Sequence, residues 1–165
     1  MTTRIGTRIV LLVAMFGTIG CDQVTKHLAA TSLSGTGERS FLADTVRLQL
    51  VENTGGFLSL GAALPPVART ALFTILTGLL LVVAAGAAIR FRWTGLPLLG
   101  TALFVSGGAS NWLDRAVHGR VTDFINVGVG PVRTGIFNVA DVAIMLGVVI
   151  FALAGLRHAG RAGRT

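Results

Sequence analysis

Four long apolar stretches dominate the pattern of hydrophobic and polar positions along this chain. They run over about 9–30, 67–89, 95–112 and 136–156. Each approaches the roughly 20 residues that a helix needs to cross the hydrocarbon core of a bilayer. The pattern predicts an all-α membrane protein, in which one membrane-embedded domain, residues 1–165, has four transmembrane helices.

Two polar segments interrupt this helical pattern, and the first has the period of a β-strand. Within about 31–66, Val46, Leu48 and Leu50 alternate with Arg47 and Gln49, as on a strand with one apolar face. Glycines punctuate the segment and two prolines end it, which is typical of turns. We expect a small extracytoplasmic β-element between the first two helices. The second segment, about 113–135, has the pattern of a short polar loop.

Composition and charge support the membrane interpretation. The chain is 52% hydrophobic and 13% charged, with a mean hydropathy of +0.75, whereas soluble domains are about 25% charged. Seven of the basic residues lie at the two chain ends and in the tight turn between the second and third stretches, with no acid beside them: Arg4, Arg8, Arg90, Arg92, Arg157, Arg161 and Arg164. By the positive-inside rule, both termini and this turn are cytoplasmic. The net charge of +7 then faces anionic lipid headgroups rather than nucleic acid.

The stretch before Cys21 has a second interpretation, as the leader of a lipoprotein. Two arginines, an apolar run over 9–19 and Gly20 precede this cysteine, as in a leader that is cleaved before a lipidated cysteine. Three further apolar stretches follow, however, and Thr18 stands where such leaders usually have leucine. We therefore interpret Cys21 as an ordinary helix residue. Cleavage at Cys21 remains an alternative, and it predicts a mass gain on Cys21 with loss of residues 1–20.

Polar residues gather where the predicted helices reach the outer face. Asp22 and Lys26 are four residues apart, so they share a helix face and can pair, either as functional groups or as an ion pair that braces the helix end. Asn53 and Gly55, in ENTGG, follow the predicted strand. Asn beside Gly usually forms a turn, and the functional alternative is an amide that binds a peptide backbone.

The sequence GGASNWLDR, residues 107–115, closes the third apolar stretch. Gly107 permits the close approach of another backbone. Asn111 lies three residues before Asp114 and four before Arg115, so it shares a helix face with each of them if the helix continues. Helix capping and packing are the structural alternative for this cluster.

Asp123 and Asp141 form a sharper pair. Asp123 lies in a mostly apolar segment beyond the third stretch, and Asp141 lies a few residues into the fourth, one turn after Asn138. Two carboxylates that share a site cannot both ionise easily, so one keeps its proton while the other acts as a base. This arrangement fits an aspartic peptidase, in which the base activates water and the acid protonates the amide. A buried packing group is the structural alternative for Asp141.

Other chemistries fit the sequence less well. A Ser/Lys dyad would need Lys26, whose neighbour Asp22 favours the charged ammonium. Hard-cation sites usually take more oxygens than the three carboxylates available here, so we expect no metal and no cofactor: Asp114, Asp123 and Asp141. A non-enzymatic membrane binding or transport protein, with acids as ion sites, is the functional alternative. The acids all fall near the outer face, which favours a hydrolytic site over a pathway through the membrane.

Five motifs resemble those of the lipoprotein signal peptidase family, also called signal peptidase II. In chain order they are DQVTK, NTGGF, GGASNWLDR, VTDF and FNVAD. The resemblance covers nearly the whole chain and includes the size and topology of the family. It implies an aspartic endopeptidase that crosses the bacterial cytoplasmic (inner) membrane several times and has its active site at the outer leaflet.

The resemblance also implies a substrate and a role for each matching residue. The family removes the signal peptide from a prolipoprotein by cutting just before the cysteine that bears diacylglycerol. Asp123 and Asp141 match the catalytic dyad, which needs no cofactor. The residues expected to bind substrate are Asn53, Gly55, Asn111, Arg115 and Asn138, and those expected to support the site are Asp22, Lys26, Gly107 and Asp114. The expected inhibitor is the cyclic peptide globomycin, and the expected state is a monomer.

Two positions depart from the family pattern. Phe57 follows Gly56 directly, one position earlier than in the usual Asn-x-Gly-Ala-Ala-Phe segment, which affects how the loop lies over the site. Val142 follows the second aspartate where the family often has serine. This change would remove a supporting hydrogen bond without touching the dyad.

Overall fold

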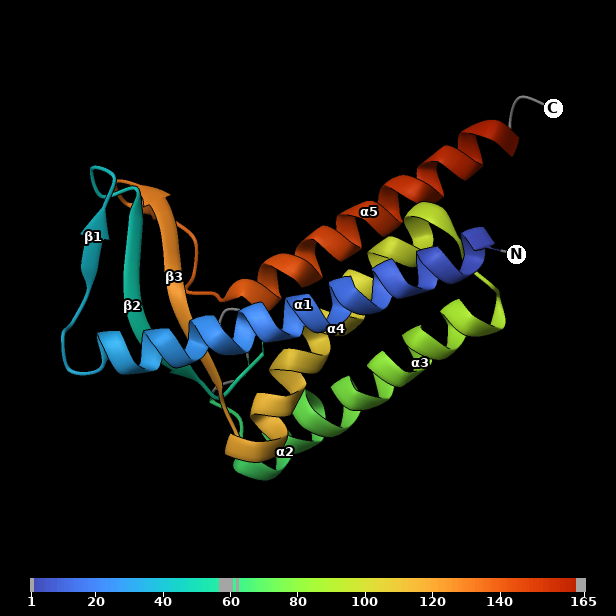
Figure 1. Ribbon diagram of the computed structural model, residues 1–165. Coiled ribbons are helices and arrows are strands. Elements are labelled where there is room, and N and C mark those ends of the chain that lie inside the picture. The colour runs from blue at the N-terminus through green and yellow to red at the C-terminus, as the bar shows by residue number, and fades with distance from the viewer. Residues whose placement is uncertain (1, 57–60, 62, 163–165) are drawn as a thin grey trace.

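Helices form most of the computed structural model, which describes residues 2–56, 61 and 63–162, with side chains from 11 to 156 inside those ranges (Figure 1). The helical segments are α1 (Thr2–Leu33), α2 (Pro66–Thr70), the π-helical η2 (Ala71–Leu76), α3 (Thr77–Arg90), α4 (Gly95–His118) and α5 (Val139–Ala162). α4 is central, because it packs against α1, α3 and α5. The predicted helical fold with a small sheet is therefore confirmed.

The helix lengths are compatible with the four predicted spans. Among the described residues, two helical runs are long and apolar enough to cross a membrane, Pro66–Arg90 and Val139–Leu156, each with a mean hydropathy of 2.5. The other two predicted spans lie in α1 and α4, which have 32 and 24 residues. At 1.5 Å per residue α4 is about 36 Å long, against about 30 Å of hydrocarbon. The four-span topology and the side on which each terminus lies stay predictions.

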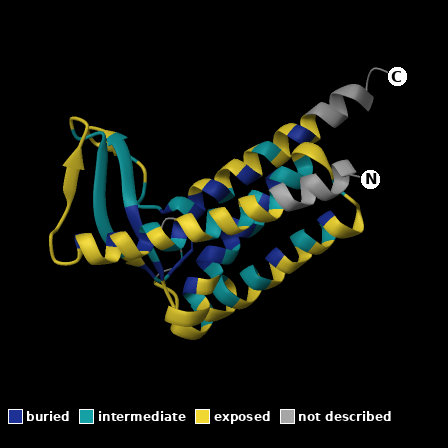
Figure 2. Cartoon of the chain, viewed as in Figure 1, coloured by how far each residue is buried: buried dark blue, intermediate teal, exposed yellow. Residues whose placement is uncertain are grey.

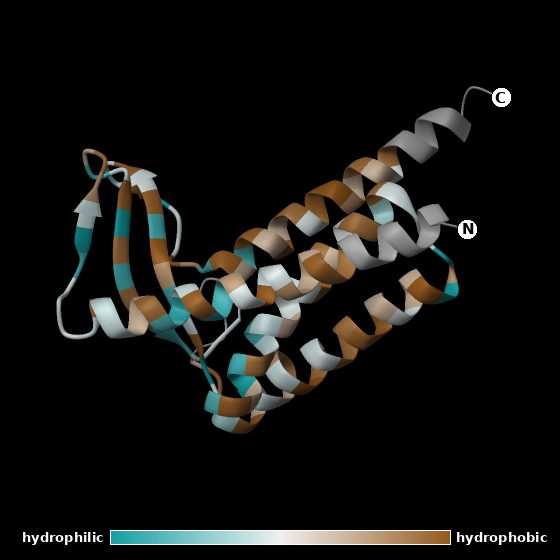
Figure 3. Ribbon diagram, in the orientation of Figure 1, coloured by the Kyte–Doolittle hydropathy of each residue, from teal (hydrophilic) through white to brown (hydrophobic). Residues whose placement is uncertain are grey.

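The helices expose their apolar side chains and bury polar ones. Figure 3 shows long apolar stretches on α3 and α5, and Figure 2 shows that many of these positions are exposed. On α3, Val82 is 69% exposed. Asp22, Ser110 and Asn138, by contrast, are 0% exposed. Such an apolar exterior matches a lipid environment, in which the few intramembrane polar groups face the inside of the bundle.

An antiparallel sheet stands at one end of the helices, opposite the end where α1 begins and α5 finishes (Figure 1). Its strands, in spatial order, are β1 (Arg39–Phe41), β2 (Val46–Asn53), β3 (Val121–Val129) and β4 (Val132–Arg133). The predicted alternation around Val46 forms β2. One face of the sheet packs on the end of α1, where Ala29, Leu33 and Phe124 form a buried cluster.

The expectation that the sheet comes only from the first polar segment was wrong. The second segment, expected to be a short polar loop, supplies β3 and β4, and α4 continues to His118 before β3 begins. Val51 pairs with Asp123 in the β2–β3 register, and an irregularity lies between Leu48 and Val51. β3 is rich in β-branched and aromatic residues, which favour strands. This pairing brings Asp123 beside the end of β2.

Glycines set the distance between α4 and α5. A Cβ built on Gly147 would lie 2.6 Å from the carbonyl oxygen of Gly100. A Cβ built on Gly107 would lie 2.5 Å from the carbonyl oxygen of Ala140, in the first turn of α5. Only glycine permits such close contact between helix backbones. Gly107 therefore allows α4 to approach the turn that contains Asp141.

Candidate active site

Asp123 is a buried carboxylate held by two amide side chains. It is 2% exposed. Asn53 Nδ2 donates to Asp123 Oδ2 at 2.8 Å, and Asn138 Nδ2 donates to Asp123 Oδ1 at 2.7 Å. Burial, together with the charge of Asp141, raises the pKa of Asp123 to about 6, although the two amide hydrogen bonds oppose this shift. This carboxyl can therefore gain or release a proton close to neutral pH.

Asp141 lies in the first turn of α5 and helps to begin that helix. Asn138, immediately before α5, accepts a hydrogen bond through Oδ1 from the Asp141 backbone N–H at 2.9 Å, and its own N–H donates to Asp141 Oδ2 at 3.2 Å. This reciprocal pattern is that of a capping box. Asn111 Nδ2 donates to Asp141 Oδ1 at 2.9 Å. Both oxygens of this carboxylate, which is 8% exposed, are thereby oriented.

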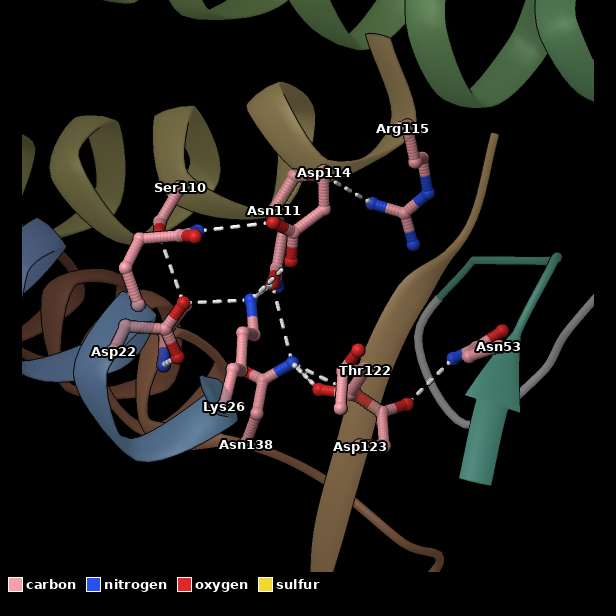
Figure 4. A network of polar contacts seen from close by, with 12 residues as sticks. Asp22, Lys26, Asn53, Ser110, Asn111, Asp114, Arg115, Thr122, Asp123 and Asn138 are labelled. Carbon is pink, nitrogen blue, oxygen red and sulfur yellow. Dashed lines mark hydrogen bonds and ion pairs between the residues drawn. The ribbon is translucent and has the colours of Figure 1, made fainter. Parts of the chain in front are cut away.

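Asn138 connects the two aspartates. One side-chain amide donates to Asp123 and accepts from the backbone of Asp141. Its Nδ2 also lies 3.1 Å from Asn111 Oδ1. Figure 4 shows Asn138 between Asn111 and Asp123. The sequence prediction that Asp123 and Asp141 share a site agrees with this geometry, in which amides rather than a direct hydrogen bond link the acids.

Asp22 and Lys26 form a buried ion pair, rather than one that reaches out to solvent. Lys26 Nζ lies 2.6 Å from Asp22 Oδ2 and 2.7 Å from Asp114 Oδ2. The same ammonium donates to Asn111 Oδ1 at 2.7 Å. Lys26 thus connects two carboxylates with the amide that orients Asp141.

Asp22 also holds the start of α5 directly. Its Oδ1 accepts a hydrogen bond from the backbone N–H of Ala140 at 2.8 Å. The first N–H groups of a helix have no partner within the helix, and they favour a negative charge. A carboxylate from α1 therefore caps the helix that presents Asp141, which explains why the DQVTK motif lies beside the site.

Sequence reasoning missed two members of this network, Gln23 and Ser110. Ser110 Oγ donates to Asp22 Oδ2 at 2.8 Å. Gln23 Nε2 donates to Ser110 Oγ at 3.0 Å and to Asp114 Oδ1 at 2.9 Å. Ser110 lies four residues before Asp114, on the same helix face, and this spacing was the available signal.

Arg115 and the segment after β2 fix Asn53. Asn53 Oδ1 accepts from the Gly55 N–H at 2.9 Å, as in an Asx-turn, and its Nδ2 donates to the Gly56 carbonyl at 3.0 Å. Arg115 Nη2 donates to the Gly55 carbonyl at 2.8 Å. The expected turn at Asn53 is present, and the Asn53 amide contacts Asp123; its binding to a substrate backbone stays a prediction.

The two departures from the family pattern have different outcomes. Phe57 lies outside the described residues. Val142 is 42% exposed, so a hydroxyl at this position would not be buried with the carboxylates. Among the described residues, no group of three or more His, Cys, Asp or Glu is placed to hold a metal ion; the three acids considered as ligands do not form such a group.

Comparison with known proteins decides the family. The family model described as signal peptidase (SPase) II matches residues 14–157. The chain belongs to the signal peptidase II family. It is 36% identical over 137 residues to the lipoprotein signal peptidase of Hydrogenovibrio crunogenus, covering 80% of this chain and 76% of the relative. It is 31% identical over 156 residues to that of Moorella thermoacetica, covering 93% and 97%.

Solved structures show the same fold for this signal peptidase II chain. A bacterial membrane enzyme solved at 2.3 Å resolution superposes with a TM-score of 0.80 and 24% identity, covering 95% of this chain and 92% of that one. A second, solved at 1.9 Å, gives a TM-score of 0.77 and 25% identity, covering 92% and 94%. The family is one of membrane peptidases, and neither a cleaved lipoprotein nor a transporter is favoured.

Proposed function

We propose that this protein is a lipoprotein signal peptidase. It removes the signal peptide from a prolipoprotein by hydrolysing the bond just before the diacylglyceryl-cysteine. Family membership and the named relatives support the reaction. The observation that supports this mechanism most directly is the pair of buried carboxylates, from β3 and from α5, connected through Asn138.

Asp123 and Asp141 act as an aspartic dyad. One carboxylate takes a proton from a water molecule as that water attacks the scissile carbonyl, and the other, protonated, gives its proton to the departing amide nitrogen. The amides of Asn53, Asn111 and Asn138 hold the two carboxylates in fixed orientations. Preorganised donors of this kind do not have to reorganise as charge develops.

The remaining site residues bind substrate or support the dyad. Asn53, Gly55, Asn111, Arg115 and Asn138 line the peptide path, with Gly55 held by Arg115. Asp22, Lys26, Gly107 and Asp114 support the site from α1 and α4. The whole chain works as one domain and as a monomer, without metal or cofactor, and globomycin inhibits it.

The protein crosses the bacterial cytoplasmic membrane four times, with its active site at the outer leaflet. The basic turn around Arg90 and Arg92 lies between α3 and α4, and such segments remain in the cytoplasm. The N-terminal end of α1 and the C-terminal end of α5 lie at the same end of the helices, opposite the sheet (Figure 1). The sheet and the two aspartates are then outside, where a lipid-modified prolipoprotein presents its cleavage site.

Cleavage of a diacylglyceryl-modified prolipoprotein by the purified full-length protein tests this function. We expect one cut, just before the lipidated cysteine, which mass spectrometry of both products identifies, and we expect globomycin to block it. Removing general acid or base catalysis lowers the rate about 10²–10⁴-fold, so D123N and D141N should each lose cleavage to this extent.

The matched control is D44N, the same chemical change in the turn between β1 and β2. Asp44 is 44% exposed and pairs with Arg47 at 2.6 Å, far from the dyad in the chain. D44N should cleave within about two-fold of wild type, since surface substitutions have small effects. Cleavage by D123N or D141N at the wild-type rate would overturn the dyad, and cleavage after residue 20 of the chain itself would favour the lipoprotein alternative.

A further inference from the structure

A small pocket lies between the start of α2 and the end of α4. Its volume is about 160 Å³, and its walls include Arg69, Arg115, Thr54, Thr70, Thr74 and Phe73. Sites for drug-sized ligands are about 300–1,000 Å³. The pocket therefore fits one small chemical group rather than a whole substrate.

The lining of the pocket has the chemistry of an anion site. Two of its described lining residues are arginines, three have hydroxyl groups, and none of the described lining residues is acidic. Arg115 Nε is buried and has no hydrogen-bond partner among the described residues. A buried donor without a partner is costly. A bound anion would satisfy it, and the planar guanidinium fork matches phosphate oxygens better than an ammonium does.

The pocket is already shaped before any ligand binds. Arg69 Nη1 donates to Thr54 Oγ1 at 2.8 Å, and Arg115 Nη2 donates to the Gly55 carbonyl at 2.8 Å. Both arginine side chains are thus anchored on the segment that follows Asn53. Preorganised side chains lose little conformational freedom on binding.

The place of the pocket in the fold indicates the source of the anion. The apolar run that can cross a membrane begins at Pro66, so Arg69 and Thr70 are in its first turns. Lipid headgroups lie at the ends of such spans. We propose that Arg69 and Arg115, with the threonine hydroxyls, bind the phosphate of a membrane phospholipid. The site shares Arg115 with the proposed peptide path, but phospholipid binding can be measured without any peptide cleavage.

Native mass spectrometry of the purified full-length protein, released from detergent, tests the proposal with four probes. Phosphatidylglycerol and phosphatidylcholine contain the phosphodiester, diacylglycerol has no phosphate, and inorganic phosphate has no lipid. Both phospholipids should remain bound more than diacylglycerol does. A hydrogen bond to a charged group contributes about 1.5–3 kcal/mol, which is roughly ten-fold or more in affinity, so R69Q should lower phosphatidylglycerol binding by at least about ten-fold.

R120Q is the matched control. Arg120 follows Gly119 of the pocket wall, but it is 51% exposed and pairs with Glu52 at 3.1 Å. It therefore reports the general attraction between basic surface and anionic lipid, and R120Q should bind within about two-fold of wild type. Equal losses of phosphatidylglycerol binding in R69Q and R120Q would overturn the proposed phosphate site in the pocket. Diacylglycerol binding as strong as phospholipid binding would overturn it too. If inorganic phosphate binds and R69Q weakens that binding, while no phospholipid binds, the site is specific for phosphate and the proposed lipid ligand is wrong.

A second variant covers the case in which R69Q does not fold, since Arg69 anchors Thr54. T70V removes one hydroxyl from the pocket at nearly the same volume. A lost hydrogen bond costs about 0.5–1.5 kcal/mol, so T70V should bind phosphatidylglycerol about two- to ten-fold more weakly. Wild-type binding by T70V, with diacylglycerol binding equally unchanged, would contradict phosphate recognition.

Discussion

Replacing Lys26 with methionine should lower the unfolding temperature more than any surface substitution. The Lys26 ammonium lies 2.6 Å from Asp22, 2.7 Å from Asp114 and 2.7 Å from the Asn111 side chain, and the side chain is 5% exposed. Methionine keeps much of the apolar stem and removes the charge. Two buried carboxylates then lose their shared cation, and breaking a buried pair in this way costs about 3–5 kcal/mol.

Thermal unfolding of the detergent-purified protein, followed by tryptophan fluorescence, measures this effect. For a chain of this size, 1 kcal/mol corresponds to about 2–4 °C, so K26M should unfold roughly 6–20 °C below wild type. The double variant D22N/K26M removes one of the two unpaired carboxylates. Its loss should therefore be smaller than the sum of the single losses, since residues in one network couple.

An unfolding temperature for K26M within about 2 °C of wild type would refute the reasoning, because this corresponds to less than about 1 kcal/mol. Strict additivity in the double variant would also count against it. Arg90→Gln is a useful control, since it removes one exposed cation from the last turn of α3. We expect R90Q to change the stability by no more than about 0.5 kcal/mol.

Two further predictions concern Asp123 and the helix crossing. Burial raises the pKa of Asp123 from 3.8 to about 6, so the folded protein binds this proton more tightly than the unfolded chain. This contribution to stability is complete below about pH 4 and declines as the pH rises to about 6. Melting curves should show a larger decline in wild type than in D123N, and an equal decline in both would contradict the assignment. Gly107→Ala, whose Cβ would lie 2.5 Å from a backbone oxygen of α5, should cost about 1–3 kcal/mol and slow cleavage. Gly86→Ala, with nothing within 4 Å, should do neither, and equal behaviour of the two variants would rule out a tight crossing.

The sequence predicted the helices and β2 because local patterns specify them. Four apolar stretches and one alternating run need no information from distant parts of the chain. Asp22 and Lys26 could likewise be paired from their spacing, and the helix continuing past Asp114 placed Asn111 and Arg115 as expected. The expected gathering of Asp123 and Asp141 rested on chemistry alone, namely that a buried acid needs a partner.

The rest could not be read from local patterns because it depends on pairing over long separations. The partner of β2 is 70 residues away at the Asn53–Asp123 contact, and a register with an irregularity between Leu48 and Val51 is not specified by either strand alone. The capping of α5 by Asp22 joins residues 118 positions apart. Nothing in the sequence around Asp22 indicates that its carboxylate accepts a hydrogen bond from the first turn of α5.

The bonds of Asp22 also imply an order of assembly during synthesis. Its pairing with Lys26 is local, whereas Asp114 lies 88 residues beyond Lys26 and the Ala140 N–H lies 118 residues beyond Asp22. In the proposed four-span topology, α1 enters the bilayer before α4 and α5 have been synthesised, so Asp22 and Lys26 can then neutralise only each other. The later helices then pack against an ion pair that is already neutral. The motif that supports the finished site therefore also lowers the cost of holding α1 in the membrane before its partners in α4 and α5 are made.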